Sequence, residues 1–129
     1  MVKIKVNGTE YVLRFDMSVS EWIEENYGDL REALKDIRTP SKTKEIMTAI
    51  FTSMANAGAD YLHAGVIYKA DDIKLFDKHT SPGRIAVIRR AIEEAVRDGS
   101  RMQVTEEDED NSVRDDYLEE VKRAEAEKN

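Results

Sequence analysis

The chain contains no cysteine and only two prolines in 129 residues. Without cysteine it can form no disulfide, no thiolate metal site and no thiol nucleophile. This absence is typical of a reducing compartment, so we expect a cytoplasmic protein. No apolar run approaches the roughly 20 residues that cross a bilayer, and we therefore expect no membrane insertion. The length favours one domain that buries a core without covalent cross-links.

The acidic excess of the chain lies entirely in its last 26 residues. Residues 104–129 hold 11 acidic and 4 basic side chains, a net charge of −7 that equals the net charge of the whole chain. Residues 1–103 hold 16 side chains of each sign and are neutral. Nonspecific nucleic-acid binding needs a cationic face, so we expect no nucleic acid partner. We predict a folded body over 1–103 and an acidic, largely disordered or weakly helical tail over 104–129.

Few side chains could carry catalysis or hold a metal ion. His63 and His79 are the only two histidines, and they are 16 residues apart on different predicted elements. A metal site needs three or four converging ligands. Glu24 and Glu25 are adjacent on a predicted helix, so their side chains diverge and cannot share a substrate. We expect a protein that is not an enzyme and that needs no cofactor.

Two runs with alternating apolar side chains flank Asn7 and Gly8. Asn-Gly is the preferred pair for a two-residue type I′ turn, so the runs predict a β-hairpin with Ile4 opposite Tyr11. An isolated hairpin is marginal in water, and its apolar face must therefore pack on helices. The alternating apolar residues are Val2, Ile4 and Val6 before the turn and Tyr11, Leu13 and Phe15 after it.

Apolar residues at three- and four-residue steps predict four to five helices after the hairpin. Ser18 with Glu21 forms a capping box, and Trp22 lies on the apolar stripe that follows. Gly28 interrupts this stripe and Asp29 can cap again, so two short helices are expected. The remaining predicted bounds are Thr39–Pro40–Ser41 to Gly65 for a central helix, Asp71 or Asp72 to Phe76 for a short helix, and Ser81–Pro82 to Gly99 for the last helix.

The predicted fold class is α+β and mostly α, with an N-terminal β-hairpin packed on four to five helices and an acidic C-terminal tail. Partner recognition by a helix in an apolar groove is the expected mode of binding. Two apolar stripes are candidates for the contact. The predicted partner-binding residues are Met47, Ile50, Phe51 and Met54 on the central helix and Tyr117, Leu118 and Val121 in the tail.

The hairpin of residues 3–15, followed by a helix from Ser18 that ends at Tyr27–Gly28, resembles the opening of tail assembly chaperones from long-tailed phages of Gram-positive bacteria. The small-residue pattern of 50–61 and the run from Ser81 to Met102 are similar to the rest of that family. The resemblance implies a non-enzymatic protein of the infected host cell, absent from the finished virion. It implies that the protein binds the tape measure protein and keeps it soluble for tail tube polymerisation. The tail tube protein and further copies of the chain are additional partners that it brings into consideration.

The alternative class is a small acidic regulator or inhibitor. Such a protein would block a basic partner through charge mimicry by the acidic tail. Charge mimicry weakens steeply as ionic strength rises, whereas apolar groove binding does not. Salt dependence therefore separates the two classes.

Ending the chain after Gln103 should leave the melting temperature nearly unchanged, because a like-charge segment adds nothing to the core. Solubility or client binding should fall, since the shortened chain is neutral and lacks the acidic tail. Thermal melts and solubility measurements of the full and shortened chains test this. A large drop in melting temperature would place the tail against the body and overturn the boundary at 103.

Overall fold

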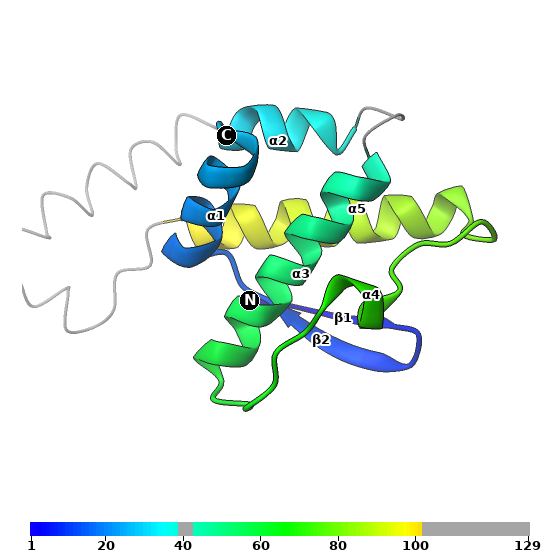
Figure 1. The fold of residues 1–129 in the computed structure, drawn as a ribbon, viewed down its shortest axis with the longest axis horizontal. Helices are drawn as coiled ribbons and strands as arrows, with labels where there is room; N and C mark the ends of the chain where they lie inside the picture. The colour runs from blue at the N-terminus through cyan, green and yellow to red at the C-terminus, as the bar shows by residue number, and fades with distance from the viewer. Residues whose placement is uncertain (39–42, 102–129) are drawn as a thin grey trace, which may run out of the picture.

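The computed structural model describes residues 1–38 and 43–101. Within these ranges the fold is α+β and mostly α, with one two-stranded antiparallel hairpin and five helices (Figure 1). The predicted boundary at 103 lies outside the described residues, as do the residues predicted to open the central helix. The elements are β1 (Val2–Val6), β2 (Thr9–Leu13), α1 (Met17–Tyr27), α2 (Leu30–Asp36), α3 (Thr43–Tyr61), α4 (Ala70–Ile73) and α5 (Pro82–Ser100).

The hairpin has the predicted turn and register. Asn7 and Gly8 have φ values of 51° and 82°, as a type I′ turn requires of both central residues. Ile4 pairs with Tyr11, and Val2 pairs with Leu13. The apolar face is directed into the molecule, since Tyr11 is 6% exposed and Leu13 is 0% exposed.

The two short helices after the hairpin are confirmed, but the first N-cap prediction is wrong. Asp16, not Ser18, caps α1, and its carboxylate accepts hydrogen bonds from the backbone N–H groups of Ser18 at 3.0 Å and Val19 at 3.3 Å. Burial raises the pKa of Asp16, but these bonds and the nearby Arg14 outweigh that effect and lower the pKa below 3.8. At Gly28, φ is 84°, and the chain turns there into α2.

The later helices match the prediction in part. Ser81 caps α5, with Pro82 in the first turn, as the sequence indicated. The central helix α3 ends at Tyr61 rather than Gly65, and His63 then takes a left-handed φ of 54°. The short helix α4 ends at Ile73 rather than Phe76, and its N-cap is Lys69, without a side-chain hydrogen bond, rather than the predicted Asp71 or Asp72.

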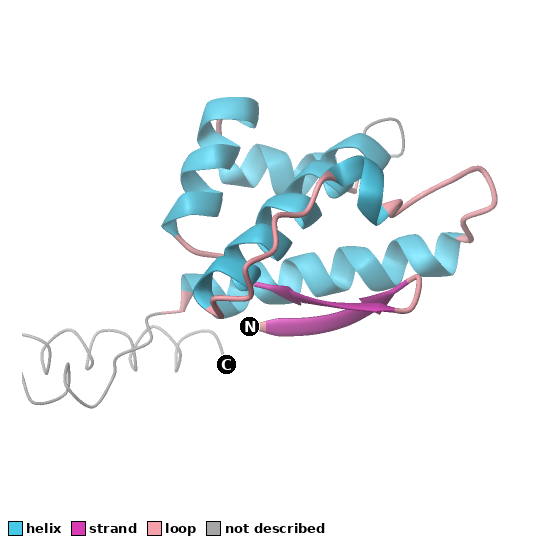
Figure 2. Ribbon diagram, turned by 60° about the horizontal axis from the view of Figure 1, so that its bottom comes forward, coloured by secondary structure: helices cyan, strands magenta, loops and turns pink. Residues whose placement is uncertain are grey.

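Helix α3 is the centre of the fold. It contacts α1, α2, α4, α5 and strand β2, so most other elements pack on it. It crosses α5 in the view of Figure 1, and the turned view shows the hairpin lying along α5 (Figure 2). The hairpin therefore closes one side of the helical layer, with β2 directed to α3 and β1 contacting α5.

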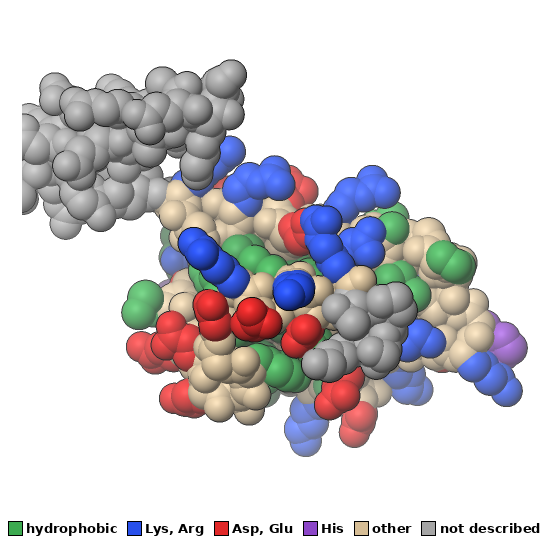
Figure 3. Space-filling model, turned by 90° about the horizontal axis from the view of Figure 1, so that it is seen from above, with side chains coloured by type: hydrophobic (Ala, Val, Ile, Leu, Met, Phe, Trp, Pro, Cys, Tyr) green, Lys and Arg blue, Asp and Glu red, His purple; other side chains and the backbone are tan. Residues whose placement is uncertain are grey.

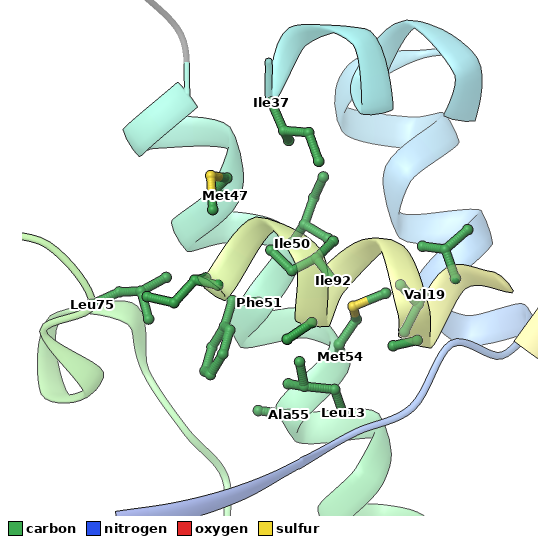
Figure 4. Packing of buried hydrophobic residues seen from close by; sticks show 14 of the residues in the cluster. Leu13, Val19, Ile37, Met47, Ile50, Phe51, Met54, Ala55, Leu75 and Ile92 are labelled. Atoms are coloured by element: carbon green, nitrogen blue, oxygen red, sulfur yellow. The ribbon is translucent and has the colours of Figure 1, made fainter. Parts of the chain in front are cut away.

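The core forms where α3 meets its neighbours. Side chains from β2, α1, α3 and α5 converge, together with Ile37 at the end of α2 and Leu75 after α4 (Figure 4). Tyr11 connects the hairpin to this core through edge-to-face contacts with Phe51 at 5.5 Å and with Tyr68 at 5.1 Å between ring centroids. No buried side-chain nitrogen or oxygen among the described residues lacks a hydrogen-bond partner.

Two glycines, one in α3 and one in α5, let backbone atoms of the chain after β1 lie directly against the backbone of these helices. A Cβ atom on Gly58 of α3 would lie 2.0 Å from the carbonyl oxygen of Val12, and one on Gly99 of α5 would lie 2.1 Å from that of Phe15. Next to the first contact, the Arg14 N–H donates a hydrogen bond of 3.1 Å to the Met54 carbonyl of α3. The residue that follows β2 is thus hydrogen-bonded directly to α3.

Gly58→Ala should destabilise the protein by about 3 kcal/mol, because the methyl group meets backbone that cannot move aside cheaply. Gly83→Ala on α5 is the matched control. Its Cβ would meet only the Ser81 Oγ at 3.9 Å, so the substitution should be neutral or stabilising by up to about 1 kcal/mol. Urea unfolding of both variants measures the difference. Equal free energies of unfolding would contradict the close approach at Gly58.

Candidate functional site

Four of the predicted partner-binding residues are core residues. Met47, Ile50, Phe51 and Met54 are each 0% exposed, since β2, α1, α2 and α5 cover the face of α3 that carries them. No partner can contact these side chains while the body keeps this conformation, so the predicted surface has to be relocated. The other three predicted residues, Tyr117, Leu118 and Val121, lie outside the described residues.

A different side of α3 is open. Between α1 and α3 lies a hollow of about 530 Å³, which we call the α1/α3 groove. Small side chains line the part of the groove that α3 forms, and Trp22 lines the part that α1 forms. The lining includes Trp22 from α1, Ala49, Ser53, Ala57 and Asp60 from α3, and Ala70 from α4.

The segment after α3 runs back along this helix and is held by one side chain. The Asn56 amide donates to the Tyr68 carbonyl at 3.0 Å and accepts from the Tyr68 N–H at 2.6 Å. This pair of bonds satisfies both backbone groups of Tyr68 without a neighbouring strand. It also sets the position of Ala70, two residues later, at the edge of the α1/α3 groove.

A second hollow of about 660 Å³, the loop hollow, continues from the first. Asn56 and Asp60 line both of them, so the two hollows meet along α3. Val66 and Ile67 line the loop hollow and are 45% and 85% exposed. With Tyr61 at 53% and Leu62 at 50%, they make the segment 61–67 the largest run of exposed large apolar side chains among the described residues.

Trp22 packs against the core, as its place on the apolar stripe of α1 predicted. It is partly buried, packs edge-to-face on Tyr27 at 5.7 Å between ring centroids, and lines the α1/α3 groove. Burial raises the pKa of the Tyr27 hydroxyl, and the nearby Glu45 carboxylate raises it further. Periodicity placed Trp22 on the inward side of α1, and its ring lies at the edge of the core.

The charges beside the two hollows are mainly acidic. Of the described residues that line them or adjoin the lining in sequence, Glu21, Asp60 and Asp71 carry carboxylates and Lys69 carries an ammonium group. All four are exposed. On one face, acidic side chains gather at the lower left and Lys and Arg side chains lie over the upper edge and centre, while both signs also occur along the lower edge (Figure 3).

The histidines do not converge. His63 lies in the exposed loop at the end of α3 and lines the loop hollow. His79 is exposed in the turn before α5, where its backbone N–H donates to the Asp77 carboxylate at 2.7 Å. Within residues 1–38 and 43–101, no group of three or more acidic or histidine side chains is arranged to hold a metal ion. In the same ranges, no helix combines the length and apolar character needed to cross a membrane.

The geometry defines a small α+β protein with an open, apolar groove beside its central helix. Comparison with protein-family models, with curated proteins and with solved structures gave no match. The site is therefore read from the residues of this chain alone.

Asn56→Ala should free the segment that Asn56 holds, because the N–H and carbonyl of Tyr68 lose their partners. We expect a loss of about 1 to 3 kcal/mol in the free energy of unfolding and faster amide hydrogen exchange at 64–69. Asn26→Ala is the control, since the Asn26 amide donates only to the exposed Trp22 carbonyl within α1. It should cost within about 0.5 kcal/mol. Unchanged exchange at Tyr68 in Asn56→Ala would contradict the role of this side chain.

Proposed function

We propose that this protein is a non-enzymatic tail assembly chaperone, which binds the tape measure protein of a long-tailed phage in the cytoplasm of an infected cell. One observation of the structure carries the binding part of the proposal. The exposed apolar run 61–67 adjoins the α1/α3 groove, and the two together form an open apolar surface beside α3. The identity of the client rests on the resemblance of residues 3–28 to the opening of that family.

The physical requirements of such a chaperone fit this surface. A client with long apolar helices needs an apolar groove to cover it until the tail tube forms around it. The groove must be open in the free protein, and yet the free protein must not aggregate. A net charge of −7 in 104–129 opposes self-association by electrostatic repulsion.

The acidic tail also supports the second candidate, an acidic regulator that blocks a basic partner by charge mimicry. In that case the binding energy would come from residues 104–129 and would be largely electrostatic. The two functions therefore place the contact on different parts of the chain. They also differ in their response to ionic strength.

Co-expression with the client tests the proposal. The client for this test is a phage tape measure protein, the partner that the resemblance implies. Its soluble fraction should rise strongly when the full chain is present, and the two should co-purify. Raising NaCl from 0.1 to 0.5 M should weaken binding by no more than about tenfold, because apolar burial is not screened. Ile67→Ser should weaken capture, while Val87→Ser, at a 54% exposed site on α5, should not.

A client that stays insoluble with or without the chain would rule out the chaperone function. Loss of the complex by about two orders of magnitude over the same salt range would favour charge mimicry instead, since that slope indicates several charge pairs. An intact complex with Ile67→Ser would remove the apolar segment from the contact.

A further inference from the structure

We infer that the α1/α3 groove binds one amphipathic helix of the client, with the small apolar face of that helix on α3 and lysine or arginine side chains along its edge. This inference rests on the proposed function and names the chemistry of the partner at the same site.

The length of the groove fits a helix of a few turns. The lining residues on α3 run from Ala49 to Asp60, and at 1.5 Å per residue they span about 16 Å along the axis. The loop hollow extends the surface past Asp60 to Ile67. A client helix lying along α3 would therefore place about three turns against the floor.

The floor and walls of the groove favour close packing of a helix. The side chains of α3 that line the groove are small or polar and include no large apolar one: Ala49, Thr52, Ser53, Asn56, Ala57 and Asp60. Trp22 on one wall and Ile67 at the far end supply the large apolar contacts. Since Ile67 is 85% exposed, its side chain has most of its apolar area available for burial by a partner.

The charge that lines the groove favours a partner helix with lysine or arginine along its edge. Among the described residues, Asp60 is the one carboxylate that lines the two hollows, and it lines both of them; Glu21, Asp71 and Lys69 lie next to lining residues in the sequence. A helix edged by glutamate would place like charges together, whereas lysine or arginine would pair with Asp60. The net charge of −7 on residues 104–129 argues by the same reasoning against the tail of this chain as the occupant.

A second copy of the chain is the other occupant to be considered. The exposed side of α5 carries Arg90 and Arg97 with Glu94 between them in the sequence, and Val87 is its only exposed large apolar side chain among the described residues. That side offers the matching charge without the apolar area that the groove requires. The observations therefore favour a separate amphipathic helix.

Two synthetic helical peptides test the inference on the full-length protein. Both carry alanine and leucine on one face, and their polar edges carry lysine in one peptide and glutamate in the other. Trp22 is the only tryptophan of the chain and lines the groove, so its fluorescence reports occupancy directly. The lysine peptide should shift the emission of Trp22 and bind at least about tenfold more tightly than the glutamate peptide.

Two variants locate the contact. Ser53→Phe fills the floor of the groove and should weaken lysine-peptide binding about tenfold, whereas Val87→Phe on α5 should leave it within about twofold. Asp60→Lys should weaken lysine-peptide binding about fivefold and strengthen glutamate-peptide binding, whereas Glu94→Lys, an exposed site on α5, should do neither. Circular dichroism and thermal melts establish that each variant is folded.

Equal binding of the two peptides, or unchanged binding in Ser53→Phe, would overturn the inference. Self-association of the free protein in sedimentation experiments that Ser53→Phe abolishes would assign the groove to a second copy and would overturn it as well. If the Ser53→Phe variant still captures the client, the groove is not the binding site, but the proposed function stands. Binding of the lysine peptide without any client capture would support the groove and contradict the chaperone function.

Discussion

The contact between β2 and α3 at Gly58 is the constraint on which the rest of the fold depends. Because Gly58 has no side chain, the Val12 carbonyl lies where a Cβ atom would otherwise be, and the Arg14 N–H reaches the Met54 carbonyl. This approach brings Tyr11 against Phe51 and buries the apolar face of the hairpin. An isolated hairpin would be marginal in water, so the hairpin and α3 stabilise each other.

Two asparagines hold the parts of the chain that lack regular structure. Asn7 sits in the hairpin turn, and its amide donates to the carbonyls of Ile73 and Lys74 at 3.2 and 3.0 Å. It thereby ties the end of α4 to the hairpin, while Asn56 ties Tyr68 to α3. The Asn56 amide donates and accepts at once, which matches the carbonyl and the N–H of an isolated backbone segment. The Asn7 amide instead donates to two carbonyls, and its oxygen accepts a hydrogen bond from the Arg84 guanidinium.

The sequence predicted the features that depend on neighbouring residues. The hairpin register followed from Asn7 and Gly8, and the start of α5 followed from Ser81 and Pro82, because these motifs fix backbone conformation locally. The N-cap of α1 was misassigned because Asp16 and Ser18 are both good capping residues two positions apart. The candidate site was misplaced for a different reason. Periodicity identifies the apolar face of α3, but only the packing of β2, α1, α2 and α5 determines that this face is covered.

The central helix consequently has two apolar sides with different roles. Its large side chains, such as Phe51 and Met54, face the core and are 0% exposed, while its small ones, such as Ala49 and Ser53, line the open groove. A helix that used its large side chains for a partner would have to open the core and lose the stability they provide. A surface of small side chains avoids that cost, because a partner can pack closely on it without any change in the body. Stability and recognition can therefore be placed on one helix, provided that they occupy different sides of it.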